Sequence, residues 1–111
     1  MKISIITITY NSAQTVEDTI KSVVAQDFPN VEYVIIDGLS KDSTLSVVNR
    51  YSPYIDKVVS EKDKGLYDAL NKGIKTATGD VIGMLHSDDL YANNQVLSKI
   101  AQQFAADPAV E

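Results

Sequence analysis

The chain contains no cysteine and no tryptophan among its 111 residues. Without cysteine it has no disulfide, no thiolate metal ligand and no cysteine nucleophile. It also has no apolar run near the ~20 residues that a membrane-spanning helix needs. Residues 1–6 amount to one strand without a small-residue cleavage site, so we do not expect a signal peptide.

Basic residues are few: ten Lys and Arg stand against fifteen Asp and Glu, for a net charge of −5. A surface of this sign has no general attraction for nucleic acid or anionic lipid. Neither the glycine-rich phosphate loop of P-loop proteins nor the dinucleotide-binding fingerprint is present. A phosphate ligand would therefore need a metal ion, a few lysines or main-chain N–H groups.

What the chain does have is a regular alternation of strand-like and helix-like segments. The predicted strands are residues 2–9, 31–36, 57–60 and 81–85, and the predicted helices are residues 13–26, 42–51, 66–77 and 93–106. Helix 66–77 is expected to pack through Leu66, Ala69, Leu70, Ile74 and Ala77. This order predicts an α/β domain over residues 1–111, with a mostly parallel sheet in a three-layer α/β/α arrangement.

Polar segments follow each predicted strand, at residues 9–12, 37–42, 61–65 and 88–89. The carboxyl ends of parallel strands share one edge of the sheet, where open α/β sheets bind their ligands. The start of helix 66–77 at Gly65 could also receive an anion, with Lys64 nearby. We therefore expect one binding site at this edge.

The acidic pair Asp88-Asp89 follows the apolar run 81–85. Two carboxylates at a strand exit can hold a hard divalent cation, although an Asp pair can also simply cap the next helix. Similar alternatives stay open elsewhere. Asp37 could accept hydrogen bonds from a base or ribose, or be a turn residue before a glycine. His86, the only histidine, could touch a ligand or be structural.

Taken in order, five stretches resemble the N-terminal half of the family-2 glycosyltransferases, which have the GT-A fold with a Rossmann-like half. They are residues 5–11 (IITITYN), 33–44 (YVIIDGLSKDST), 61–73 (EKDKGLYDALNKG), 78–80 (TGD) and 85–89 (LHSDD). Each stretch is short, but their order and spacing cover nearly the whole chain.

The resemblance implies a nucleotide-sugar site. Asp37 would contact the nucleobase, and Thr9, Tyr10 and Asn11 would form the other wall of the base pocket. The residues implied to line the diphosphate and sugar are Asp63, Lys64, Gly65, Asp68 and Asn71. Asp88 would bind Mg²⁺ or Mn²⁺ with help from Asp89, because His86 stands where the family's Asp-x-Asp motif has its first aspartate.

The resemblance further implies metal-assisted sugar transfer in polysaccharide or other glycan biosynthesis, by an inverting reaction. The donor would be a UDP-sugar, with GDP- and dTDP-sugars as alternatives, and the acceptor a glycan or a lipid-linked molecule. Complete catalytic domains of the family are about twice this length, so we expect a truncated chain whose general base lies beyond Glu111. The alternative is a non-catalytic nucleotide-binding or structural module.

Two expectations concern assembly and location. An open edge at strand 81–85 would expose an apolar face, so we predict dimerisation or aggregation of the chain. The absence of cysteine mildly favours a cytoplasmic protein. The resemblance implies, as an alternative, peripheral attachment to the cytoplasmic face of a membrane in the full-length protein.

Overall fold

The computed structural model describes residues 1–106; the ending 107–111, where we expected the chain to be interrupted, lies outside the described residues. The elements in chain order are strand β1 (Ile3–Thr9), helix α1 (Val16–Val24), strand β2 (Val31–Asp37), helix α2 (Thr44–Arg50), the 3-10 turn Ser52–Tyr54, strand β3 (Lys57–Ser60), helix α3 (Leu66–Thr76), strand β4 (Val81–Met84) and helix α4 (Val96–Ala106). None of the helices within residues 1–106 has the length and apolar character to cross a membrane.

The four strands form one sheet in the order β3-β2-β1-β4, and every neighbouring pair is parallel. The chain moves outward from β1 to β3 and then crosses, through α3, to the other side of β1. The order of the strands therefore reverses between β1 and β4, which is where open α/β sheets bind their ligands. The predicted α/β fold with a parallel sheet is confirmed.

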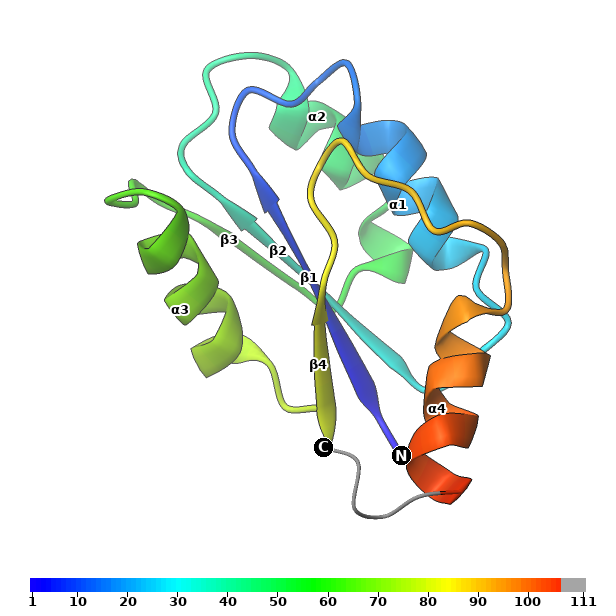
Figure 1. The fold of residues 1–111 in the computed structure, drawn as a ribbon. Helices are drawn as coiled ribbons and strands as arrows, with labels where there is room; N and C mark the ends of the chain where they lie inside the picture. The colour runs from blue at the N-terminus through cyan, green and yellow to red at the C-terminus, as the bar shows by residue number, and fades with distance from the viewer. Residues whose placement is uncertain (107–111) are drawn as a thin grey trace.

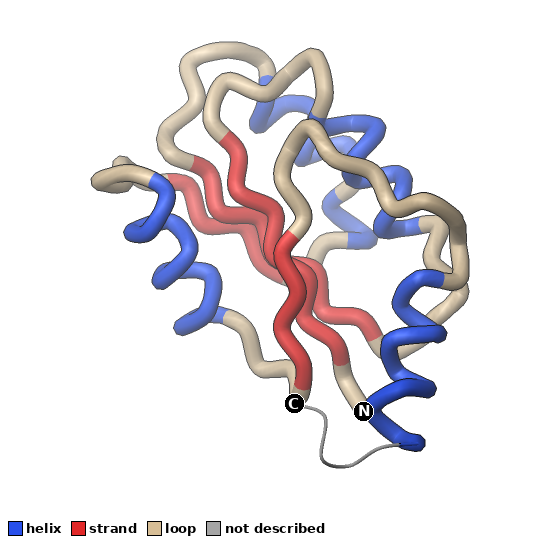
Figure 2. Tube along the Cα trace, viewed as in Figure 1, coloured by secondary structure: helices blue, strands red, loops and turns tan. Residues whose placement is uncertain are grey.

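Helices cover both faces of the sheet (Figures 1 and 2), as predicted. On one face, α1, α2 and α4 pack on Ile3, Ile5, Tyr33 and Ile35 through side chains such as Val16, Ile20, Val48 and Leu97. These positions alternate along the strands with those of the opposite face, as the pleat requires. Because both faces are covered, β1 and β2 are buried on both sides, and polar residues among them, such as Ser4, Thr7 and Glu32, are hydrogen-bonded.

On the other face, α3 packs over β1 and β2 with Ala69 and Gly73 as its buried residues. A Cβ atom on Gly73 would lie 2.7 Å from Cγ2 of Ile6, so the glycine lets the helix approach the sheet. The predicted packing face was wrong in part, since Leu66 and Ile74 are 51% and 46% exposed. The small side chains, rather than the large apolar ones, define the contact.

Two predicted helices begin three residues late. Residues 13–15 form a turn in which the N–H groups of Thr15 and Val16 donate to the carbonyl of Ser12. Residues 93–95 precede α4 in a loop that is hydrogen-bonded to the segment just after α1: Gln26 Nε2 donates to the Asn93 carbonyl at 2.7 Å. In both places side-chain and turn hydrogen bonds replace the first helical turn that periodicity suggested.

Candidate functional site

The carboxyl ends of all four strands meet at one edge of the sheet, at the top of Figure 1. The main-chain N–H of Gly38 donates to the Thr9 carbonyl (3.0 Å), which ties the loop after β2 to the end of β1. Ser12 Oγ and Ser87 Oγ, 2.9 Å apart, connect the loops that follow β1 and β4. The expected convergence of the loops is therefore present, and the strand-order reversal lies within it.

Asp37 is the centre of this edge and has no exposed surface. Its Oδ1 accepts hydrogen bonds from Thr9 Oγ1 (2.6 Å) and Ser40 Oγ (2.5 Å). Its Oδ2 accepts from the Ser40 N–H (2.9 Å) and Ser60 Oγ (3.0 Å). A carboxylate has about four lone-pair positions. Protein donors therefore occupy Asp37 fully, and a bound base could reach it only by replacing one of them.

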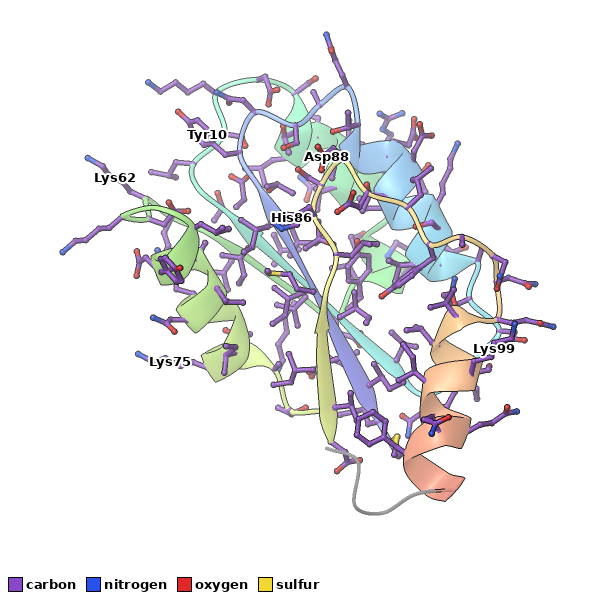
Figure 3. The ribbon with its side chains drawn as sticks, viewed as in Figure 1. Tyr10, Lys62, Lys75, His86, Asp88 and Lys99 are labelled. Atoms are coloured by element: carbon purple, nitrogen blue, oxygen red, sulfur yellow. The ribbon has the colours of Figure 1, made fainter. Side chains whose placement is uncertain are left out.

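The loop after β1 presents Tyr10 to solvent and holds Asn11 in a strained conformation. Tyr10 is 57% exposed at the edge of the sheet (Figure 3). Asn11 has φ of 48°, a left-handed conformation that asparagine tolerates better than most residues. Its side-chain Oδ1 accepts the Lys41 N–H at 2.8 Å, while its own N–H donates to Ser40 Oγ at 2.9 Å. Tyr10 thus offers a free aromatic face, whereas Asn11 joins two loops.

The loop after β3 carries Asp63, Lys64 and Gly65. Gly65 has φ of +114° directly before α3, a conformation that favours glycine. Its N–H donates to Asp63 Oδ1 (3.2 Å), and the Lys64 N–H donates to Asp68 Oδ2 (2.8 Å). These carboxylates occupy the N–H groups of the two residues just before α3, next to the helix start at which the sequence suggested that an anion could bind.

Lys72 of helix α3 also holds the loop after β3. Its Nζ donates to the Lys62 carbonyl (2.8 Å) and lies 3.3 Å from Glu61 Oε1 and 3.5 Å from Asp68 Oδ2. The hydrogen bond from the Lys64 N–H, together with Lys72, lowers the pKa of Asp68. Partial desolvation would lower the pKa of Lys72, but its two acidic partners raise it. Asn71 lies on the exposed side of the same helix.

A cleft of about 250 Å³ opens between the loops after β1 and β3. Its lining residues are Ile8, Thr9, Tyr10, Asp63, Gly65, Leu66 and Ala69. Four of these are predicted site residues, so the structure brings Thr9, Tyr10, Asp63 and Gly65 together. The other predicted site residues do not line this cleft: Asn11, Asp37, Lys64, Asp68, Asn71, Asp88 and Asp89.

Gly38 explains how the two walls approach one another. A Cβ atom at this position would lie 2.7 Å from Asp63 Oδ2 and 3.4 Å from Cδ1 of Tyr10. The glycine therefore leaves room for the Asp63 carboxylate beside the β2 loop. The sequence indicates only that Gly38 belongs to a turn, and no local pattern indicates this contact.

The acidic pair lies on the loop beyond β4, which runs along α1 (Figure 3 labels Asp88). Asp88 and Asp89 are both exposed, and the Asp89 N–H donates to the His86 carbonyl (3.0 Å) to close a turn. Within residues 1–106, no group of three or more His, Cys, Asp or Glu side chains forms a metal-binding cluster. The pair fits a cation that takes its remaining ligands from substrate phosphates, as protein-bound Mg²⁺ commonly does.

Several residues that shape the site were not predicted from the sequence as site residues. Ser40 and Ser60 saturate Asp37, Ser87 joins the loop of the acidic pair to Ser12, and Lys72 anchors the loop after β3. Serine and lysine are common at strand ends, in loops and on helices, so their residue types alone do not distinguish them. The contacts of Ser60 and Ser87 join segments far apart in the chain, whereas Ser40 is only three residues from Asp37.

Comparison with known families identifies the family of this chain. The family model described as "Glycosyl transferase family 2" matches residues 4–110. The chain belongs to glycosyl transferase family 2. The uncharacterized glycosyltransferase Rv1514c of Mycobacterium tuberculosis is 36% identical over 101 residues, covering 90% of this chain and 38% of that relative. The chain therefore spans less than half the length of this relative.

Two solved structures share the arrangement. The mannosyltransferase PcManGT from Pyrobaculum calidifontis, in complex with GDP-Man and Mn²⁺, superposes with a TM-score of 0.89 at 30% identity, over 98% of this chain and 33% of that one. S. aureus TarS 1–349, in complex with UDP-GlcNAc, has a TM-score of 0.88 at 31% identity, over 96% of this chain and 32% of that one. The resemblance to the GT-A glycosyltransferases is confirmed.

Proposed function

We propose that residues 1–111 are the donor-binding part of a glycosyltransferase that uses a nucleoside-diphosphate sugar. The observation that carries the proposal is that the carboxyl ends of the strands bring together a cleft between the loops after β1 and β3, lined by Tyr10 and Asp63, and an exposed carboxylate pair on the loop after β4. The GDP-Man and UDP-GlcNAc bound to the two similar structures support the same ligand class. We favour a UDP-sugar, with GDP- and dTDP-sugars as alternatives.

Asp88, assisted by Asp89, is proposed to hold Mg²⁺ or Mn²⁺. When bound, such a cation would offset the negative charge that develops on the departing diphosphate. The chain itself is acidic, with a net charge of −5, so it offers little other compensation for two phosphates. The Mn²⁺ in the PcManGT complex supports a divalent metal ion.

In the cleft, we assign to Tyr10 the face on which a nucleobase packs, since its ring is exposed and its neighbours are fixed by hydrogen bonds. Thr9 and Asn11 support that wall. Asp37 is proposed to read the base by exchanging a serine donor for a base N–H, because all four of its positions are filled.

On the sugar side of the same cleft, Asp63 and Gly65 line the space, and Lys64 is exposed beside it. Asp68 would hold their loop, and Asn71 would flank it.

Sugar transfer itself is proposed to need residues outside this chain. A metal-bound carboxylate is a poor general base, so Asp88 and Asp89 are unsuited to deprotonating an acceptor. We assign the base, and the site for a glycan or lipid-linked acceptor, to a region beyond Glu111, with an inverting displacement. The protein is proposed to be cytoplasmic, with peripheral membrane attachment of a longer protein as the alternative.

Calorimetric titration of the 111-residue chain with UDP, GDP and dTDP, with and without Mn²⁺, tests the proposal. We expect tighter binding with Mn²⁺ than without it, no sugar transfer, and loss of the metal effect in Asp88→Asn. Asp80→Asn is the matched control, because it makes the same charge change at the opposite end of β4. Metal-independent binding that Asp88→Asn leaves unchanged would favour a non-catalytic nucleotide-binding module instead.

A homodimer that forms through the outer strand β4 is a separate part of the proposal. Within residues 1–106, strand β4 has a neighbouring strand on one side only, and its Ile82 and Met84 are 43% and 39% exposed. They lie on the face of Ser4 and Ile6, which α3 covers only over β1 and β2. Light scattering should show association that Met84→Lys weakens; a monomer at high concentration would contradict this.

A further inference from the structure

Helix α1 has a polar stripe in addition to the apolar face that packs on the sheet. Thr19 and Ser22 lie in α1 and Gln26 lies two residues after its end, and all three contact the segment that follows β4. We call these residues the α1 polar stripe. Figure 1 shows this segment, in yellow to orange, running along α1 before α4 begins.

Thr19 makes the contact of the stripe that lies nearest to the acidic pair, and it is fully buried. Its Oγ1 lies 2.7 Å from the carbonyl oxygen of Asp89 and 3.0 Å from that of Ser87. These carbonyls flank Asp88 on both sides. A hydroxyl has one proton to donate, so the shorter contact, to Asp89, is the stronger candidate for the hydrogen bond.

The direction of this hydroxyl is informative because a helical threonine commonly donates to the carbonyl four residues earlier. Here that atom, the carbonyl oxygen of Thr15, is 3.5 Å away, at the limit of a hydrogen bond. The hydroxyl is therefore directed at the loop and not at its own helix. A purely helical role for Thr19 would not place two loop carbonyls around it.

Farther along the stripe, the same loop is held at two more points. The Tyr91 N–H donates to Ser22 Oγ (3.3 Å). Gln26 uses both ends of its amide: Nε2 donates to the Asn93 carbonyl (2.7 Å), and Oε1 accepts the Leu97 N–H (3.1 Å). Ser22 and Gln26 thus fix the path of the chain into α4, while Thr19 acts at the acidic pair.

We propose that Thr19 is a positioning residue for the cation: it fixes the main chain on either side of Asp88, and so the direction of both carboxylates. This inference rests on the proposed function. Asp88 and Asp89 are exposed and β4 ends at Met84, so the side chains are oriented by their own main chain. Residues that orient metal ligands from outside the ligand set change metal affinity when they are removed.

The test uses Thr19→Val, which keeps the side-chain shape and removes the hydroxyl, and Thr19→Ser, which restores it. We measure the Mn²⁺ concentration that gives half-maximal enhancement of UDP binding by the 111-residue chain. For Thr19→Val we expect this concentration to rise roughly 3- to 10-fold. The expected rise is smaller than that for removing a residue that hydrogen-bonds a metal ligand directly, because Thr19 acts through the main chain. Thr19→Ser should stay close to wild type. Metal-free UDP affinity should not change in either variant.

Thr76→Val is the matched control. Thr76 is also a helical threonine, and its Oγ1 donates to the Lys72 carbonyl of its own helix (2.7 Å) at the far end of α3. An unchanged Mn²⁺ requirement in Thr19→Val would overturn the proposal. The proposal would also be overturned if Thr76→Val raised the Mn²⁺ requirement as much as Thr19→Val does. It would be overturned as well if Thr19→Val lost metal-free UDP affinity to the same extent, since either result would show a general loss of structure. Wild-type protein without any Mn²⁺ effect would instead refute the proposed metal site itself, and with it this role.

Discussion

Asp37 and the pair Asp88-Asp89 lie at the same edge of the sheet, yet their environments are opposite. Asp37 is buried and accepts four hydrogen bonds from Thr9, Ser40 and Ser60. The acidic pair is exposed, and its position depends on contacts of its main chain. The difference separates two uses of a carboxylate: one joins strands and loops into a rigid edge, and the other stays available for an external cation.

The largest expected effect comes from neutralising the buried carboxylate. Asp37→Asn should lower the free energy of unfolding by roughly 2–4 kcal/mol, because the new amide group turns an N–H₂ toward donors that then lack an acceptor. Asp88→Asn should change it by no more than about 0.5 kcal/mol, as is usual for exposed positions. Urea denaturation of both variants measures the contrast. Equal effects would show that the two environments do not differ as described.

A second buried carboxylate, Glu32, extends the comparison to pH. Burial alone would raise the pKa of Glu32, but hydrogen bonds from the main chain and hydroxyl of Thr78 and from Ser4, together with Lys57, lower it to about 2. The ordinary value is 4.5. A lowered pKa in the folded state means that the stabilisation is present above pH 4.5 and is lost as the pH falls toward 2.

Glu32→Gln should therefore remove part of the acid sensitivity of the fold. At neutral pH the variant should be less stable by roughly 1–3 kcal/mol, since charge-assisted hydrogen bonds are lost. Between pH 4.5 and about 2 its stability should fall less steeply than that of the wild type. Urea midpoints across this range measure both effects. Parallel pH profiles for the two proteins would contradict the assignment.

The sequence predicted the parallel α/β fold well because apolar-rich strand segments alternate with helix-like segments, and its turns contain glycine, proline and aspartate. It also predicted that Asp37, Asp63 and Asp88 would reach the same edge. It did not predict that Asp37 is saturated, because Ser60 belongs to another strand and Ser40 to a loop. The packing of α3 was predicted in part, since a close approach at Gly73 outweighs the apolar spacing of Leu66 and Ile74.

The smallest expected effect concerns a carboxylate of an intermediate kind, Asp68, which is half-buried and holds the loop after β3 together with Lys72. Lys72→Met should change the free energy of unfolding by less than about 1 kcal/mol, because partly exposed ion pairs contribute little. It should still loosen the loop that carries Asp63, by removing the hydrogen bond to the Lys62 carbonyl and the contact with Glu61.

If Asp63 lines the ligand cleft, UDP affinity should fall roughly 2- to 5-fold in Lys72→Met, equally with and without Mn²⁺. Hydrogen exchange of residues 62–65 should become faster in the same variant. This pattern differs from that of Thr19→Val, which should alter only the Mn²⁺ requirement. If Lys72→Met weakened only the metal-dependent binding of UDP, the loop after β3 would be linked to the cation. The distinction between carboxylates that hold the structure and carboxylates that bind the cation would then not hold.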